Sequence, residues 1–83
     1  FRPGTGMVRF AIESAETITP RLTVFDVFGR RVRGLGDGRP VQGRAEVRWD
    51  GRDDGGRRLS SGVYFVRLTG GRETRVVRVP MIR

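Results

Sequence analysis

The stretch that decides the fold runs from Trp49 to Leu68 and has the sequence WDGRDDGGRRLSSGVYFVRL. Trp49 ends an alternation of apolar residues that starts at Ala45, which is typical of a strand with one buried face. The next residues, 50–56, hold three Asp and three Gly, which favour turns through local hydrogen bonds and positive φ. After Gly62, a run of β-branched and aromatic residues predicts a strand buried largely on both faces. We therefore expect two strands joined by an ordered, glycine-rich loop.

The rest of the chain also alternates with a period of two and shows no helical periodicity. Breaks are expected at Thr17–Pro20, at the tight turn Phe28–Arg30, in the loop Gly34–Gly43 and at the hairpin turn Gly70–Gly71. The expected strands lie at residues 8–13, 22–27, 31–35, 45–49, 63–69 and 74–79. Six or seven short strands separated by turn signals favour an antiparallel β-sandwich.

Length and composition predict one small domain that spans residues 1–83. A chain of this size buries only about 60% of its unfolded surface, so its stability is marginal. The sequence has no Cys, which excludes disulfides and thiolate metal sites. No apolar run approaches the roughly 20 residues of a membrane-spanning helix, so no membrane span is expected.

The chain is strongly basic, with a formal net charge of +8. All 17 basic residues are Arg, and the absence of Lys and Asn indicates a GC-rich genome. Arg binds carboxylates and phosphates in a bidentate manner, so one hypothesis is a polyanion-binding face made of Arg72, Arg75 and Arg78, with an anionic surface polysaccharide as partner. Sequence-specific nucleic-acid binding is not expected from the charge alone.

The acidic loop has two interpretations. Asp50, Asp53 and Asp54 together could bind calcium, because hard cations take clustered carboxylates. Their spacing does not match an EF-hand, however, and side chains that cap backbone N–H groups in a turn explain the same residues. We therefore expect a capping turn, with no metal or other cofactor.

Asp26 is unusual because it interrupts an apolar run, and a buried carboxylate needs a partner. Arg30 or Arg31, just past the expected turn at Gly29, is the candidate partner in a structural ion pair. A catalytic role is not expected. Without His, Cys or Lys the usual general bases and activated nucleophiles are missing, and Ser60 has no base beside it.

The order W-D-G-x-D, then a glycine, then S-G-x-Y-F resembles the FlgD-type immunoglobulin-like domain. The segment LTVFDVFGRRVRGL, residues 22–35, is also similar to that family, as is Phe10-Ala11-Ile12 before it. The resemblance implies a small immunoglobulin- or fibronectin-III-like sandwich of six to seven antiparallel strands. It also implies a set of structural core and turn residues, namely Asp26, Gly29, Arg30, Trp49, Asp50, Gly51, Asp53, Gly56, Gly62 and Tyr64.

The family resemblance implies a non-catalytic structural or interaction module. Such domains occur in the flagellar hook-cap protein, and similar ones act as C-terminal type IX secretion sorting domains. The end of the chain resembles the basic, apolar termini of the sorting group, although Pro80 is expected to interrupt its last strand. The expected partner edge is formed by Val79, Pro80, Met81, Ile82 and Arg83.

We therefore expect an extracellular or cell-surface bacterial protein whose partner is secretion or anchoring machinery. The alternatives are a subunit of a filament or hook-cap-like assembly, which joins copies of itself through edge strands, and a polyanion-binding module.

Overall fold

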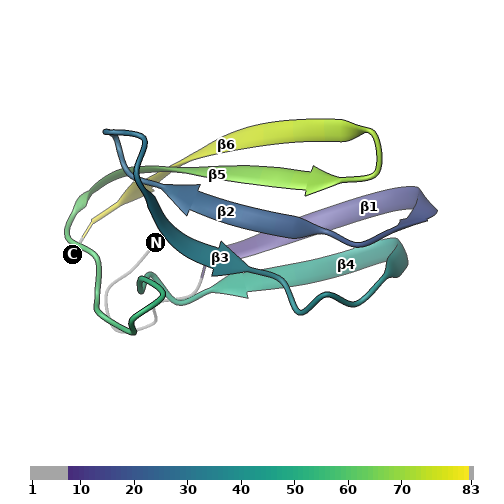
Figure 1. Cartoon of the computed structure of the whole chain (residues 1–83), viewed down its shortest axis with the longest axis horizontal. Coiled ribbons are helices and arrows are strands. Elements are labelled where there is room, and N and C mark those ends of the chain that lie inside the picture. Colours follow the sequence, from purple (N-terminus) through teal and green to yellow (C-terminus); the bar gives the residue numbers. More distant parts are fainter. Residues whose placement is uncertain (1–7, 83) are drawn as a thin grey trace.

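The computed structural model of the chain describes residues 8–82 and consists of strands joined by turns (Figure 1). The strands are β1 (Val8–Ile18), β2 (Arg21–Phe25), β3 (Arg31–Leu35), β4 (Val41–Trp49), β5 (Gly62–Gly70) and β6 (Glu73–Met81). Within residues 8–82 there is no helix long and apolar enough to cross a membrane.

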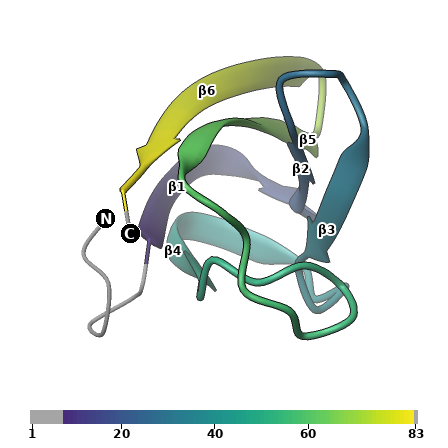
Figure 2. The same ribbon diagram turned by 90° about the vertical axis from the view of Figure 1, so that its left-hand side faces the viewer.

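The strands form two antiparallel sheets that face each other (Figure 2). One sheet pairs β1 with β4, and the other has the order β3-β2-β5-β6. The predicted fold class, a small immunoglobulin-like β-sandwich, is confirmed.

The core lies between the sheets and follows the alternation of each strand. Every second residue of a strand points to the same face, so one face of each sheet becomes apolar. The buried side chains are Ile12, Leu22, Val24, Trp49, Tyr64, Val66, Val79 and Met81. Trp49 is fully buried, as its place in the alternation of β4 predicts.

Several strand ends differ from the expected ones, because strand pairing and turn contacts set them. β1 continues through the expected break to Ile18, which pairs with Val41 and so also starts β4 earlier than expected. β2 ends at Phe25, because Asp26 bonds to the backbone of the following turn.

The prediction that β5 is buried on both faces is wrong. Tyr64 and Val66 are buried on the inner face, whereas Phe65 on the outer face is only half-buried and Arg67 is exposed. The outer face of this sheet carries no further layer of the described residues, so its apolar side chains pack only against their neighbours on the same face.

The last strand also differs from expectation. β6 runs through Pro80 without interruption, because an edge strand tolerates the missing N–H. Of the expected partner edge, Val79 and Met81 point into the core, and only Pro80 and Ile82 are exposed. Arg83 lies outside the described residues. Deletion of residues 79–83 would remove the core side chains of Val79 and Met81 and is therefore expected to unfold the domain.

Replacing Trp49 by Ala should destabilise the domain by roughly 3–5 kcal/mol, because it leaves a large cavity between the sheets. Trp49→Phe, which keeps most of the volume, should cost clearly less. Denaturant melts of both variants measure the two free energies of unfolding. A loss below about 1 kcal/mol for the alanine variant would contradict the role of Trp49 in the core.

Candidate functional site

The turn between β2 and β3 is closed by the side chain of Asp26. Its Oδ1 accepts hydrogen bonds from the backbone N–H of Phe28 at 2.9 Å and of Arg30 at 3.0 Å. Its Oδ2 accepts a bond from Nε of Arg30 at 2.9 Å, so the expected structural ion pair is present and its partner is Arg30. Gly29 adopts a φ of 80°, which favours glycine.

The carboxyl of Asp26 is only 13% exposed. Burial raises its pKa, but the backbone N–H of Arg30, the Arg30 side chain and the backbone N–H of Phe28 lower it. The net pKa of Asp26 lies below the ordinary value, as expected for a carboxylate that accepts several hydrogen bonds.

The loop after β4 contains a second copy of this turn. Asp53 Oδ1 accepts hydrogen bonds from the backbone N–H of Gly55 and of Arg57, both at 2.9 Å. In both copies the first and last residues of the turn bond through the backbone, and the fourth residue is a glycine with positive φ. The two turns share the sequence D-x-x-G-R, at residues 26–30 and 53–57. This repetition was not among the features predicted from the sequence.

Arg33, on β3, ties the second loop to the four-stranded sheet. Its Nη1 donates to Oδ1 of Asp50 at 3.3 Å and to the carbonyl oxygens of Arg52 and Asp53, both at 3.2 Å. The side chain is 25% exposed, less than its neighbour Arg31. The role of Arg33 was not predicted from the sequence; the available signal was an arginine at an inward position of β3 in a chain whose loop after β4 carries three Asp.

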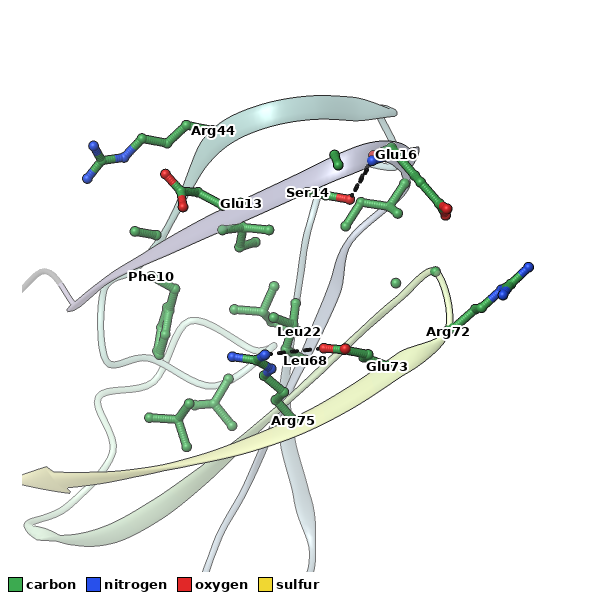
Figure 3. A pocket seen from close by; sticks show the side chains of 18 of the residues that line it. Phe10, Glu13, Ser14, Glu16, Leu22, Arg44, Leu68, Arg72, Glu73 and Arg75 are labelled. Carbon is green, nitrogen blue, oxygen red and sulfur yellow. Dashed lines mark hydrogen bonds and ion pairs between the residues drawn. The ribbon is translucent and has the colours of Figure 1, made fainter.

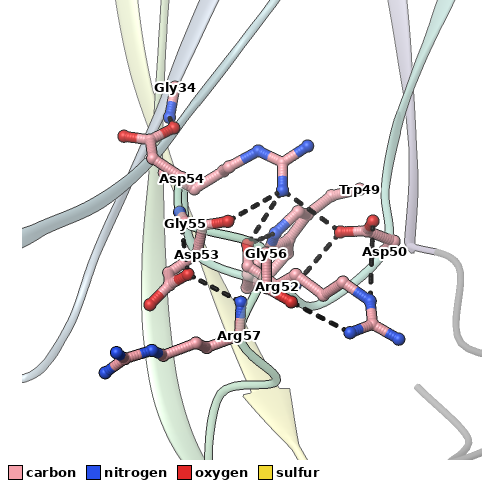
Figure 4. A network of polar contacts seen from close by, with 10 residues as sticks. Gly34, Trp49, Asp50, Arg52, Asp53, Asp54, Gly55, Gly56 and Arg57 are labelled. Atoms are coloured by element: carbon pink, nitrogen blue, oxygen red, sulfur yellow. Dashed lines mark hydrogen bonds and ion pairs between the residues drawn. The ribbon is translucent and has the colours of Figure 1, made fainter.

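Asp54 covers the outer edge of β3. Its backbone N–H donates to the carbonyl of Val32 at 2.9 Å, and its Oδ1 accepts from the N–H of Gly34 at 3.0 Å (Figure 4). All three acidic side chains of the loop thus accept bonds from protein donors, because Asp50 also accepts from the N–H of Arg52 at 3.1 Å. The capping turn explains the carboxylates, and none of the described residues forms a cluster of three metal-ligating side chains.

Trp49 and Tyr64, the two aromatic residues of the predicted core and turn set, hold the loop between β4 and β5 from its core side. Nε1 of Trp49 donates to the carbonyl of Arg52 at 3.0 Å, and the ring meets Tyr64 edge-on with centroids 6.0 Å apart. The Tyr64 hydroxyl donates to the carbonyl of Ser60 at 2.8 Å. Gly51 is buried with a φ of 75°, and Gly62 is the exposed first residue of β5.

One side of the sandwich is open. The side at β3 is closed by the loop described above, but β1 and β6 are edge strands, and no described strand pairs with their free edges (Figure 2). Between them lies a groove of about 1040 Å³. Phe10, Leu22 and Leu68 point into it (Figure 3).

The groove is apolar at its floor and charged at its rim. On β6, the inner face is buried at Val79 and becomes exposed toward the β5–β6 hairpin, where Val77 is 46% exposed. Beyond it Arg75 pairs with Glu73 at 3.2 Å, and both are mostly exposed (Figure 3). The groove can therefore accept an extended segment that is apolar on one side.

The predicted polyanion face is not one face. Arg75 and Arg78 lie three residues apart on β6 and so point to opposite faces, while Arg72 lies in the hairpin turn. Arg75 is also engaged by Glu73.

The outer face of the two-stranded sheet carries three arginines, at positions 9, 44 and 48, and two glutamates, at positions 13 and 46. Glu46 lies beside Arg48, whose Nε donates to it at 2.8 Å. This hydrogen bond lowers the pKa of Glu46, burial raises it, and the charges of Arg48, Arg9 and Arg44 lower it again, so that the net pKa lies below the ordinary value. The carboxylates on this face are thus matched with the arginines.

Replacing Arg33 by Met should destabilise the domain by roughly 2 kcal/mol, because two loop carbonyls and the Asp50 carboxylate lose a charged donor. The neighbouring Arg31→Met is the matched control. Its exposed pair with Asp54, at 3.8 Å, should contribute less than about 1 kcal/mol. Equal losses in urea melts of the two variants would contradict the bracing role of Arg33.

Calcium should leave the melting temperature unchanged within about 1 °C, because protein donors already occupy the loop carboxylates. The comparison is a thermal melt in chelator and in millimolar calcium. A rise of several degrees, abolished in Asp53→Asn, would establish a metal site instead.

One of three comparisons with known proteins gives a match, and that match is to a family of immunoglobulin-like domains, in agreement with the sandwich fold. Neither a curated protein nor a solved structure matched the chain. The family model for the FlgD Ig-like domain matches residues 2–73, which include both D-x-x-G-R turns and Trp49. This family consists of structural, non-enzymatic domains. The chain therefore belongs to the FlgD Ig-like domain family.

Proposed function

We propose that this domain is a non-catalytic attachment module of a secreted or cell-surface bacterial protein, and that it binds a β-strand of a partner along β6. The observation that carries the proposal is the open side of the sandwich, where no strand of residues 8–82 pairs with the free edge of β6 and an apolar groove lies beside it. Exposed strand edges are sites for strand addition, because their backbone groups lack partners.

The register of the β5–β6 hairpin indicates which backbone groups of β6 are free. The two-residue turn starts with Gly71 at a φ of 63°, and Gly70 pairs with Glu73. The pair that closes such a turn is hydrogen-bonded, and bonded and non-bonded pairs then alternate along the ladder. The N–H groups of residues 74, 76 and 78 therefore point away from β5, toward a possible partner.

Pro80 falls on the same alternation. It pairs with Val63 at a non-bonded position, so its missing N–H costs no bond to β5 and ends the row of free donors. A partner strand is thereby directed to the hairpin half of β6. This half also faces the exposed part of the groove, where Val77 is uncovered.

A strand added here would form a fifth strand of the larger sheet and lie opposite β1. Its inward side chains would cover Phe10, Leu68 and Val77, and its outward ones would meet solvent. The partner segment is therefore expected to alternate between apolar and polar residues. Burial of these groove residues would supply the affinity, and the backbone bonds would fix the register.

The partner that we propose is a component of secretion or anchoring machinery, which makes the domain a sorting or anchoring module. Membership of a structural family supports an interaction role, and the described residues supply no general base or activated nucleophile beyond carboxylates and hydroxyls. A second copy of the chain is the other possible donor of the strand, as in a hook-cap-like or filament assembly. Size measurement at increasing concentration separates the two.

Val77→Glu should abolish attachment, because it places a charge in the groove that the partner strand would bury. Val76→Glu is the matched control, because Val76 is the preceding residue of the same strand. Its side chain is 62% exposed and points to the outer face of the sheet, away from the groove. In the source bacterium, the surface-bound fraction of a reporter fused to the domain should fall more than about tenfold for Val77→Glu only.

Both variants should melt like the parent, since both positions are exposed. If Val77→Glu reached the surface as the parent does, the groove would have no role in attachment. If the parent formed oligomers that Val77→Glu alone abolished, and attachment were unchanged, the strand donor would be another copy and the sorting proposal would be wrong.

A further inference from the structure

The outer face of the four-stranded sheet carries a diagonal row of arginines. Arg78 on β6 lies opposite Phe65, Arg67 on β5 lies opposite Val76, and Arg21 on β2 lies opposite Thr69. Each step moves to the next strand and two residues along it. All three side chains therefore point to the same face and form one line across β6, β5 and β2.

Strand geometry sets the spacing of this row. Neighbouring strands lie about 4.8 Å apart, and two residues advance about 6.7 Å along a strand, so successive arginines have Cα atoms about 8 Å apart. Such a row presents regularly spaced cations over a length that several monomers of a linear polymer would cover.

The row is not neutralised within its own face. The outer positions of β2, β5 and β6 carry no Asp or Glu, and none of the three arginines forms an ion pair with another described residue. The outer face of β1 and β4 is different, because its arginines 9, 44 and 48 stand among Glu13 and Glu46. The excess positive charge of the strands is thus concentrated on one of the two faces.

Two aromatic side chains lie beside the row, and an arginine of the row covers the ring of one of them. Phe25 and Phe65 are cross-strand neighbours and are half-buried. The guanidinium of Arg67 lies 5.0 Å from the centroid of the Phe25 ring and covers it. This contact holds the cation in place, whereas single-stranded nucleic acids are bound largely through base stacking on exposed rings.

We propose that this row binds an anionic polysaccharide, through carboxylate or sulfate groups that repeat along the chain. Arginine suits these groups because its planar fork donates two parallel hydrogen bonds to a carboxylate or a similar oxyanion. Thr23 and Thr74 lie beside the arginines on the same face and supply hydroxyls for sugar hydroxyl groups, whereas Thr69 Oγ1 donates to the carbonyl oxygen of Arg21 at 3.5 Å. The site is separate from the groove and does not depend on the proposed attachment function.

The test compares two triple variants of the 83-residue chain. Arg21→Gln, Arg67→Gln and Arg78→Gln together remove the row. Arg9→Gln, Arg44→Gln and Arg48→Gln together remove the same charge from the other face. Binding to heparin and to polygalacturonate is measured over a range of salt concentrations, and thermal melts check that both variants fold.

Loss of the row should weaken binding to at least one of the two polysaccharides about tenfold or more at 0.1 M salt and reduce the slope of log affinity against log salt by about 2. The control should lose less than about threefold. Equal losses in the two variants would show attraction by net charge only and overturn the proposal. So would failure of the parent to bind either polysaccharide, or tighter, row-dependent binding to an oligothymidylate probe, which would indicate a nucleic-acid site.

Discussion

The burial of Trp49 is the constraint on which the rest of this domain depends. Its ring fills the space between the sheets against Tyr64, and its Nε1 must also find an acceptor, which the carbonyl of Arg52 supplies. One side chain thereby fixes both the distance between the sheets and the path of the following loop. A domain of 83 residues without disulfides has few other means to define its packing.

The acidic and basic residues of the turns order the loops that Trp49 alone does not hold. Each D-x-x-G-R turn places a carboxylate over backbone N–H groups that would otherwise lack partners, so the loops are ordered without metal ligands. Arg33 and Asp54 then attach the second loop to β3 and cover its edge. The closed side of the sandwich is therefore built from polar contacts, and on the open side no loop of residues 8–82 covers the strand edges.

Most of the fold could be predicted from the sequence, because the apolar alternation is local. The positions of β4 and β5, the inward direction of Trp49 and the capping turn at Asp53 all follow from residue types at short spacing. Asp26 was expected inside a strand, as one half of an ion pair with Arg30 or Arg31, and its capping of the backbone N–H groups of the turn was not predicted. The extension of β1 to Ile18 could not be predicted, since it depends on a partner in β4.

The surface features were harder to predict for the same reason. Arg72, Arg75 and Arg78 are close in sequence, yet strand alternation separates Arg75 from Arg78. The row at residues 21, 67 and 78 comes from three strands and exists only once their register is known. The groove likewise depends on which strands become edges, and Pro80 changes from a strand breaker to a tolerated edge residue when β6 takes that place.

β6 joins the two proposed surfaces, and its geometry keeps them compatible. Val77 points into the groove, while Arg78, the next residue, points to the opposite face. A strand added along the free edge of β6 would extend the sheet sideways and leave the Arg78 side chain uncovered, because backbone pairing occurs in the plane of the sheet. The domain can then hold a protein strand and an anionic polymer at once, and the two would be coupled only through the side chains that the added strand itself places beside the row. A partner strand with acidic outward residues would compete with the polymer for Arg78, whereas one with neutral outward residues would not.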